Sequence, residues 1–100
     1  MKHTVMALVA VLGCAAASCG PVQYSVHVLR ASAALAEAEE SNAAELAPYE
    51  YYYADEHMKQ ARREVGYSDF QAAAKCARIA TEYGNKATSI SNRRRQEEGR

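Results

Sequence analysis

From residue 23 onward the apolar residues recur at steps of three and four, and no stretch alternates apolar and polar residues as a half-buried strand does. This spacing places side chains on one face of an α-helix. The first such row is Tyr24, Val28, Ala31, Leu35 and Ala38, within a helix predicted for residues 23–46. Most residues in the rows are alanine, which buries little area, so we expect a weakly stabilised core that needs a partner or self-association.

Proline, glycine and capping residues divide the pattern into three helices. Pro48 predicts a turn near Ala47 and the start of a second helix, which Gly66 ends. Ser68 and Gln71 form a capping box, which predicts a third helix from about residue 69. Because short connections make neighbouring helices antiparallel, the sequence predicts an all-α fold of three antiparallel alanine-rich helices, in which the second and third form the tighter hairpin.

The first eighteen residues have the parts of a secretory signal: Lys2, an apolar stretch over residues 5–12, and small residues up to position 18. Ordinary signal peptidase would cut after Ala17. Lipoprotein processing would cut before a cysteine, at Cys14 or Cys19. Cys14 would leave an apolar core of only about eight residues, which favours Cys19.

Residues 16–19, Ala-Ala-Ser-Cys, resemble a bacterial lipobox, although Ala16 stands where that pattern prefers leucine. The resemblance implies that Cys19 carries a diacylglycerol and a further acyl chain such as palmitate, a nearly permanent membrane anchor. Gly20, where an aspartate would favour the inner membrane, implies the outer membrane. Cleavage after Ala17 would instead release a soluble protein, and this alternative stays open.

The chain therefore divides into a leader (1–18), an acylated linker (19–22), a helical domain (23–90) and a charged tail (91–100). The tail contains no apolar residue and is expected to fray. Its Arg93, Arg94 and Arg95 are candidates for contact with an anionic surface, either lipid headgroups or the peptidoglycan cell wall. The alternative is a solvated chain end.

Four tyrosines cluster at the start of the second helix. Tyr51 belongs to the apolar row, whereas Tyr49, Tyr52 and Tyr53 form a candidate partner surface, because tyrosine combines a broad apolar ring with a polar tip. Packing within the hairpin is the competing interpretation. Cys76 lies on an apolar row, which favours a core thiol over an intermolecular disulfide.

Motifs for catalysis and metal binding are missing from the sequence. It contains no nucleophile elbow and no glycine-rich phosphate loop, and His27 and His57 lack the spacing of metal ligands. We therefore predict no enzyme, no metal and no cofactor. Twelve basic and twelve acidic residues give zero net charge, which argues against nucleic acid as a partner.

A family resemblance covers roughly residues 31–90. The residues that carry it are the alanine-rich first helix, Ala47-Pro48-Tyr49-Glu50, Gly66-Tyr67, and Ala73, Ala77 and Ala80. This pattern resembles the family catalogued as domain of unknown function 4398, and the resemblance implies a small envelope protein with no catalytic residues to carry over.

We expect a non-catalytic outer-membrane lipoprotein that faces the periplasm as a structural or adaptor element. The alternative is a soluble secreted or periplasmic helical module that binds peptides or cell-wall glycan.

Overall fold

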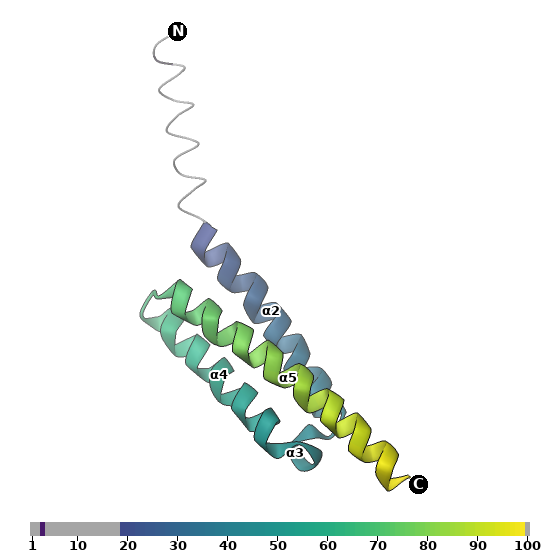
Figure 1. Cartoon of the computed structure of the whole chain (residues 1–100). Helices are drawn as coiled ribbons and strands as arrows, with labels where there is room; N and C mark the ends of the chain where they lie inside the picture. The colour runs from purple at the N-terminus through teal and green to yellow at the C-terminus, as the bar shows by residue number, and fades with distance from the viewer. Residues whose placement is uncertain (1–2, 4–18, 100) are drawn as a thin grey trace.

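The computed structural model describes residue 3 and residues 19–99. This part of the chain forms helices and no strand: α2 (Cys19–Glu40), α3 (Ala43–Leu46), α4 (Pro48–Gly66) and α5 (Phe70–Glu98) (Figure 1). The all-α prediction is confirmed, and Pro48 occupies the first turn of α4 as predicted. Apart from position 3, the predicted leader lies outside the described residues.

The helices form a bundle in which α5 lies between α4 and α2 (Figure 1). α4 and α5 are antiparallel, joined by the turn at residues 67–69. α2 and α5 run parallel, since Tyr24 meets Phe70 at one end and Arg95 reaches Ser41 at the other. As predicted, the second and third helices make the tighter hairpin, because α4 packs far more extensively on α5 than on α2, and α5 also packs as extensively against α2.

Small residues explain the close packing of α2 on α5. Gly84 of α5 faces Ala34 of α2 so closely that a Cβ on Gly84 would lie 3.0 Å from the Cβ of Ala34 and 3.3 Å from its carbonyl oxygen. Helices with small residues at their contact can bring their backbones together. Glycine is therefore required at this position for the observed spacing.

The buried core consists of two clusters along α5. The first surrounds Met58, the largest fully buried side chain, and includes Ala31, Ala61, Ala77 and Ala80. The second lies nearer the carboxyl end of α5 and comprises Ala38, Ala43, Ala47 and Ala87, with Tyr51 and Ile90 packed against it. Alanine dominates both clusters, as the sequence predicted.

The first helix begins and ends earlier than predicted: it spans Cys19–Glu40 rather than residues 23–46, so it includes the predicted 19–22 linker. Asn42 has a φ of 60°, a left-handed conformation that asparagine tolerates better than most residues. The Ser41 hydroxyl donates a hydrogen bond to the Glu37 carbonyl, 2.9 Å away. The chain turns there, and the single turn of α3 leads into α4.

The start of α5 also differs from the prediction by one residue. Asp69, not Ser68, is the N-cap, and its Oδ1 accepts a hydrogen bond from the Ala72 amide at 3.0 Å. Ser68 has a φ of 60°, so it reverses the chain instead of capping the helix.

The predicted fraying of residues 91–100 is wrong over the described part, because α5 continues to Glu98. Ser91 is fully buried. Arg95 Nη2 donates to the Ser41 carbonyl at 2.7 Å, and Arg94 Nη1 donates to the Leu46 carbonyl. These bonds satisfy carbonyls at the α2–α3 and α3–α4 turns, so tertiary contacts hold the polar end of α5 in place.

Candidate interaction surface

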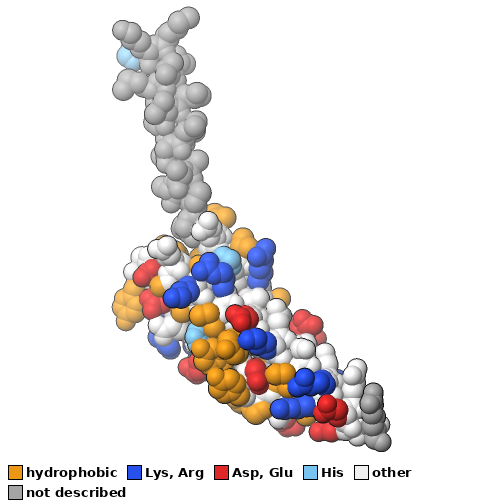
Figure 2. Space-filling view, in the orientation of Figure 1, with side chains coloured by type: hydrophobic (Ala, Val, Ile, Leu, Met, Phe, Trp, Pro, Cys, Tyr) orange, Lys and Arg blue, Asp and Glu red, His pale blue; other side chains and the backbone are white. Residues whose placement is uncertain are grey.

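Tyr49, Tyr52 and Tyr53 share one face of the first turns of α4, because residues three and four apart are neighbours on a helix. Together with Pro48, Glu56 and His57 they line a shallow, largely apolar depression, here called the tyrosine patch. Tyr49 is 67% exposed and Tyr52 is 55% exposed. Figure 2 shows hydrophobic side chains gathered over the α4 side of the molecule.

Neighbouring rings fix the position of Tyr53 in this patch. The ring of Tyr53 stacks on that of Tyr49, with centroids 5.8 Å apart, and lies 4.3 Å from the rings of both His57 and Tyr83. Tyr83 belongs to α5, so these contacts tie the patch to the central helix. The patch is therefore held in shape by the α4–α5 hairpin before any partner binds.

Tyr51 lies on a different side of α4. Its ring packs against the second core cluster, and it meets Tyr52 edge to face at 5.2 Å. Burial, followed by the nearby carboxylates of Glu39 and Asp55, raises the pKa of Tyr51 above its ordinary value. Tyr51 thus packs on the core, Tyr49 and Tyr52 are exposed, and Tyr53 is partly buried against Tyr83 within the hairpin.

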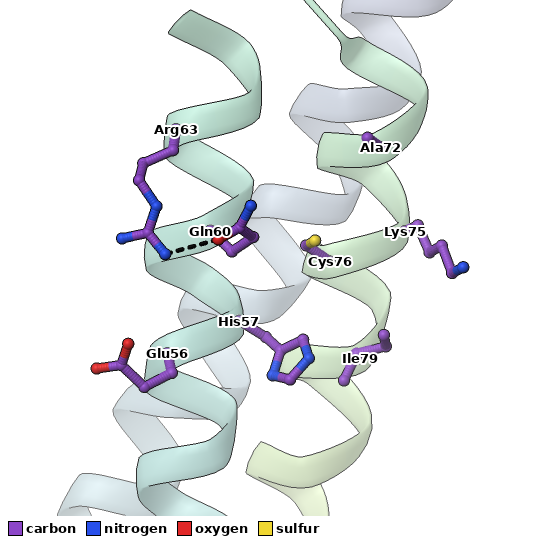
Figure 3. A pocket seen from close by; sticks show the side chains of 8 residues that line it. All are labelled: Glu56, His57, Gln60, Arg63, Ala72, Lys75, Cys76 and Ile79. Carbon is purple, nitrogen blue, oxygen red and sulfur yellow. Dashed lines mark hydrogen bonds between the residues drawn. The ribbon is translucent and has the colours of Figure 1, made fainter. Parts of the chain in front are cut away.

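A groove between α4 and α5 continues from the tyrosine patch, sharing Glu56 and His57 with it. Its lining comprises Glu56, His57, Gln60, Arg63, Ala72, Lys75, Cys76 and Ile79 (Figure 3). His57 and Cys76 point between the two helices, whereas Glu56 and Lys75 point away from each other toward solvent (Figure 3). Patch and groove therefore form one continuous surface, in which the groove adds polar side chains to a largely apolar lining.

Hydrogen bonds within α4 orient the polar side chains that line the groove. His57 Nδ1 donates to the Tyr53 carbonyl at 2.9 Å, which leaves Nε2 of the neutral ring as an acceptor. Arg63 Nη2 donates to Gln60 Oε1 at 2.6 Å, and Gln60 Nε2 donates to Glu64 Oε1 at 2.7 Å. These side chains are oriented by their own helix.

Cys76 is a half-buried free thiol that packs against the Met58 cluster. Burial, with a smaller contribution from Glu64, raises the pKa of the thiol above its ordinary value. A raised pKa keeps the thiol protonated near neutral pH and lowers its reactivity. These features suit a core residue better than a nucleophile.

The other predicted site residues lie apart from the tyrosine patch. Cys19 is the first residue of α2, at the end of the bundle that also holds the α4–α5 turn (Figure 1). Arg93, Arg94 and Arg95 lie in the last turns of α5, at the opposite end. Within residues 3 and 19–99, no three His, Cys, Asp or Glu side chains gather as a metal site would need.

Sequence reasoning missed the groove, since it treated His57 and Cys76 as separate, isolated residues. The sequence did place His57 on the second predicted helix and Cys76 on the third, and a hairpin of these two helices can bring both residues to one groove. It also gave no role to the second apolar row of α2, which the structure leaves exposed at Val22, Val26 and Leu29.

No helix in the described part of the chain combines the length and the apolar character needed to cross a membrane. Residues 28–100 match a family described as Domain of unknown function (DUF4398). No curated protein and no solved structure shows significant similarity to the chain.

Proposed function

Because the chain belongs to the DUF4398 family, whose description assigns no activity, we propose a function from the arrangement of its own residues. The protein is a small, non-catalytic lipoprotein of the outer membrane, anchored through Cys19. Its helical domain faces the periplasm and acts as an adaptor that binds a protein partner through the tyrosine patch.

The tyrosine patch is the observation that carries this proposal. Two largely exposed tyrosines, Tyr49 and Tyr52, lie beside a third ring that the hairpin already holds in place. Tyrosines are enriched among the residues that contribute most to protein–protein binding, because they bury a broad ring and keep a hydroxyl for hydrogen bonds. A pre-positioned patch also loses little side-chain entropy when a partner binds.

The polarity of the bundle agrees with an anchor at Cys19. The α2 start and the α4–α5 turn lie at one end, where Tyr67 is 82% exposed, and tyrosine is common at membrane interfaces. The tyrosine patch begins at Pro48, near the other end of α4. A partner could therefore reach the patch without approaching the lipid headgroups.

The groove residues favour binding over catalysis. The Cys76 thiol has a raised pKa, and the histidine nearest to it uses Nδ1 for a bond to its own helix backbone. A nucleophilic site needs a lowered thiol pKa and a base oriented toward the nucleophile.

The alternative function is a soluble module that binds peptides or cell-wall glycan. The continuity of the tyrosine patch with the polar groove favours it, because such ligands need both apolar surface and hydrogen-bonding groups. This function requires cleavage after Ala17. A separate contact of Arg93, Arg94 and Arg95 with peptidoglycan has less support, since Arg94 and Arg95 already bond to carbonyls of the chain.

The first experiment is the intact mass of the protein purified from the membranes of its host, compared with a Cys19→Ser variant. We expect the mass of residues 19–100 plus acyl chains, and loss of that species in the variant. A lipid-free mass beginning at Ser18 would contradict the anchor and favour the soluble module.

The second experiment tests the patch with a photo-activated benzophenone amino acid at Tyr52, in intact cells. We expect one discrete cross-linked protein, which disappears when Tyr49 is also replaced by alanine. The same amino acid at Tyr67, which is exposed but distant from the patch, is the matched control. Equal cross-linking at both positions would contradict a specific surface.

A further inference from the structure

α2 has apolar residues on two opposite faces. The inner row, Tyr24, Val28, Ala31, Leu35 and Ala38, packs into the two core clusters. The outer row is Val22, Val26, Leu29, Ala33 and Ala36, each two positions before an inner one and so about 200° away around the helix. All five outer residues are exposed.

The large members of the outer row are strongly exposed: Val22 is 59%, Val26 is 42% and Leu29 is 71% accessible. No other described helix covers them, since α5 and α4 both lie on the inner side of α2 (Figure 1). A helix that is apolar on both sides is typical of a buried position in a larger assembly. The outer row therefore marks a surface that is covered in the functional protein.

We propose that the outer row of α2 binds the same row of a second copy of this chain, with the two α2 helices parallel. Steps of four, three, four and three over residues 22–36 are the spacing of a coiled-coil seam. A two-fold contact of this kind is self-complementary, so each residue of the row meets its own counterpart. The parallel orientation rests on the proposed function, because lipid at Cys19 would hold both α2 helices by the same end in one membrane.

The residues beside the outer row suit this pairing. In the heptad register, Gln23, Arg30 and Glu37 flank one side of the row, and Ser25, Ser32 and Glu39 flank the other. Parallel pairing places Arg30 of one copy opposite Ser25 of the other, and Glu37 opposite Ser32. No like charges meet across the seam in this parallel arrangement.

A lipid surface is a weaker candidate for the occupant. The row extends about 21 Å along the helix axis, so an α2 anchored at its first residue would hold Ala33 and Ala36 far from the membrane. A helix lying flat on the membrane normally carries several lysines or arginines beside its apolar face. Between residues 19 and 36 α2 carries Arg30 alone.

The seam is short, so we expect dimers to form mainly when both chains are held in one membrane. It spans two heptads, below the three or four of an independently stable coiled coil. Tethering both chains in one membrane raises their effective concentration, which can increase association by orders of magnitude without any new contact. We therefore expect dimers of the lipid-anchored protein and mostly monomers of the Cys19→Ser chain at the same total concentration.

The test is disulfide cross-linking of single-cysteine variants of the full chain in host membranes, in a Cys76→Ser background. Val22→Cys, Leu29→Cys and Ala36→Cys probe the ends and the middle of the row. Lys75→Cys, an exposed position on α5, is the control. With a mild oxidant, we expect all three row variants to form dimers at least about tenfold faster than Lys75→Cys.

Other patterns would overturn the proposal. Cross-linking at Leu29→Cys alone would indicate an antiparallel pair, and rates no higher than at Lys75→Cys would exclude a dimer through this row. Adding Leu29→Glu to Val22→Cys should reduce the dimer about tenfold while circular dichroism stays helical, since Leu29 makes little contact within one chain. Persistence of the dimer in that variant would also overturn it.

The cross-linking result and the mass of the same samples separate the two proposals. Acylated Cys19 without cross-links keeps the lipoprotein and rejects the dimer. Cross-links at all three positions in an unacylated chain, repeated with Cys19→Ser to remove that free thiol, keep the parallel dimer and reject the anchor.

Discussion

The two interfaces of α5 are built on different principles. Against α2, the helix presents Gly84, and the backbones approach until a single added Cβ would lie 3.0 Å from Ala34. Against α4, the space is filled by large side chains, with Met58 fully buried and Tyr53 in contact with Tyr83. The close backbone approach therefore lies at the α2 contact, where Tyr24 and Phe70 also meet, whereas the largest fully buried side chain belongs to α4.

Openings lie on both sides of α5. A pocket lined by Gln23 of α2 and by Phe70 and Arg78 of α5 lies where these two helices begin, and the outer row of α2 is exposed on the far side of that helix. On the other side, the groove between α4 and α5 lies beside the tyrosine patch. The two surfaces proposed above to bind partners, the tyrosine patch and the outer row of α2, therefore lie on different helices.

Truncating the largest core side chain should have the greatest effect on stability. Met58→Ala removes the side chain around which the first cluster packs, and alanine neighbours cannot fill the space. We expect a loss of about 3 kcal/mol in the free energy of unfolding, measured by urea denaturation. A loss below about 1 kcal/mol would show that the α4 interface does not depend on side-chain volume.

The α2 interface should respond in the opposite way, to added volume. Gly84→Leu inserts a side chain against the backbone of Ala34, and we expect a loss of about 2 kcal/mol by the same measurement. Gly66→Ala is the matched control, because a Cβ there meets no atom within 4 Å. If both variants keep the parental stability, the close approach of α2 to α5 is not required.

The N-cap of α5 is Ser68 in the sequence prediction and Asp69 in the structure, and two substitutions distinguish the two residues. Asp69→Ala should cost about 1 kcal/mol, because it removes the side-chain cap on the Ala72 amide. Ser68→Gly should preserve or slightly increase stability, since glycine favours the positive φ found there. If Ser68→Gly lowers the unfolding temperature more than Asp69→Ala does, then Ser68 is the N-cap.

The smallest effect concerns Tyr51, where α4 comes near the acidic end of α2. Its pKa is raised by burial first and by Glu39 and Asp55 next, so the folded state keeps the phenol proton to higher pH than the unfolded chain. Stability from this residue is complete below its ordinary pKa of 10.0 and falls as the pH rises above it.

Unfolding should therefore become easier in the parent as the pH rises above about 10, and less so in Tyr51→Phe. Tyr67→Phe, at an 82% exposed ring, is the control and should follow the parent. Identical pH profiles for parent and Tyr51→Phe would show that the phenol is as well solvated in the folded chain as in the unfolded one.

The sequence by itself determined that the chain forms helices, and it located both ends of α4. Apolar spacing is a local property, and proline fixes its own backbone angle, so the start of α4 at Pro48 needed no tertiary information. The division of the tyrosines followed in the same way, because the angle between helical positions separates Tyr51 from its three neighbours. The family resemblance, too, was carried by these local features.

Tertiary structure alone decided which helices pack closely and how far α5 extends toward the C-terminus. No local rule showed that Gly84 would meet Ala34, since residues fifty positions apart were brought together only by the path of the whole chain. The last turns of α5 are polar and looked unfit for a stable helix, yet Arg95 satisfies the Ser41 carbonyl. The groove and the exposed outer row of α2 also depend on tertiary structure. The spacing of apolar residues shows that a helix has an apolar face, but only the packing of the other helices decides whether that face is buried.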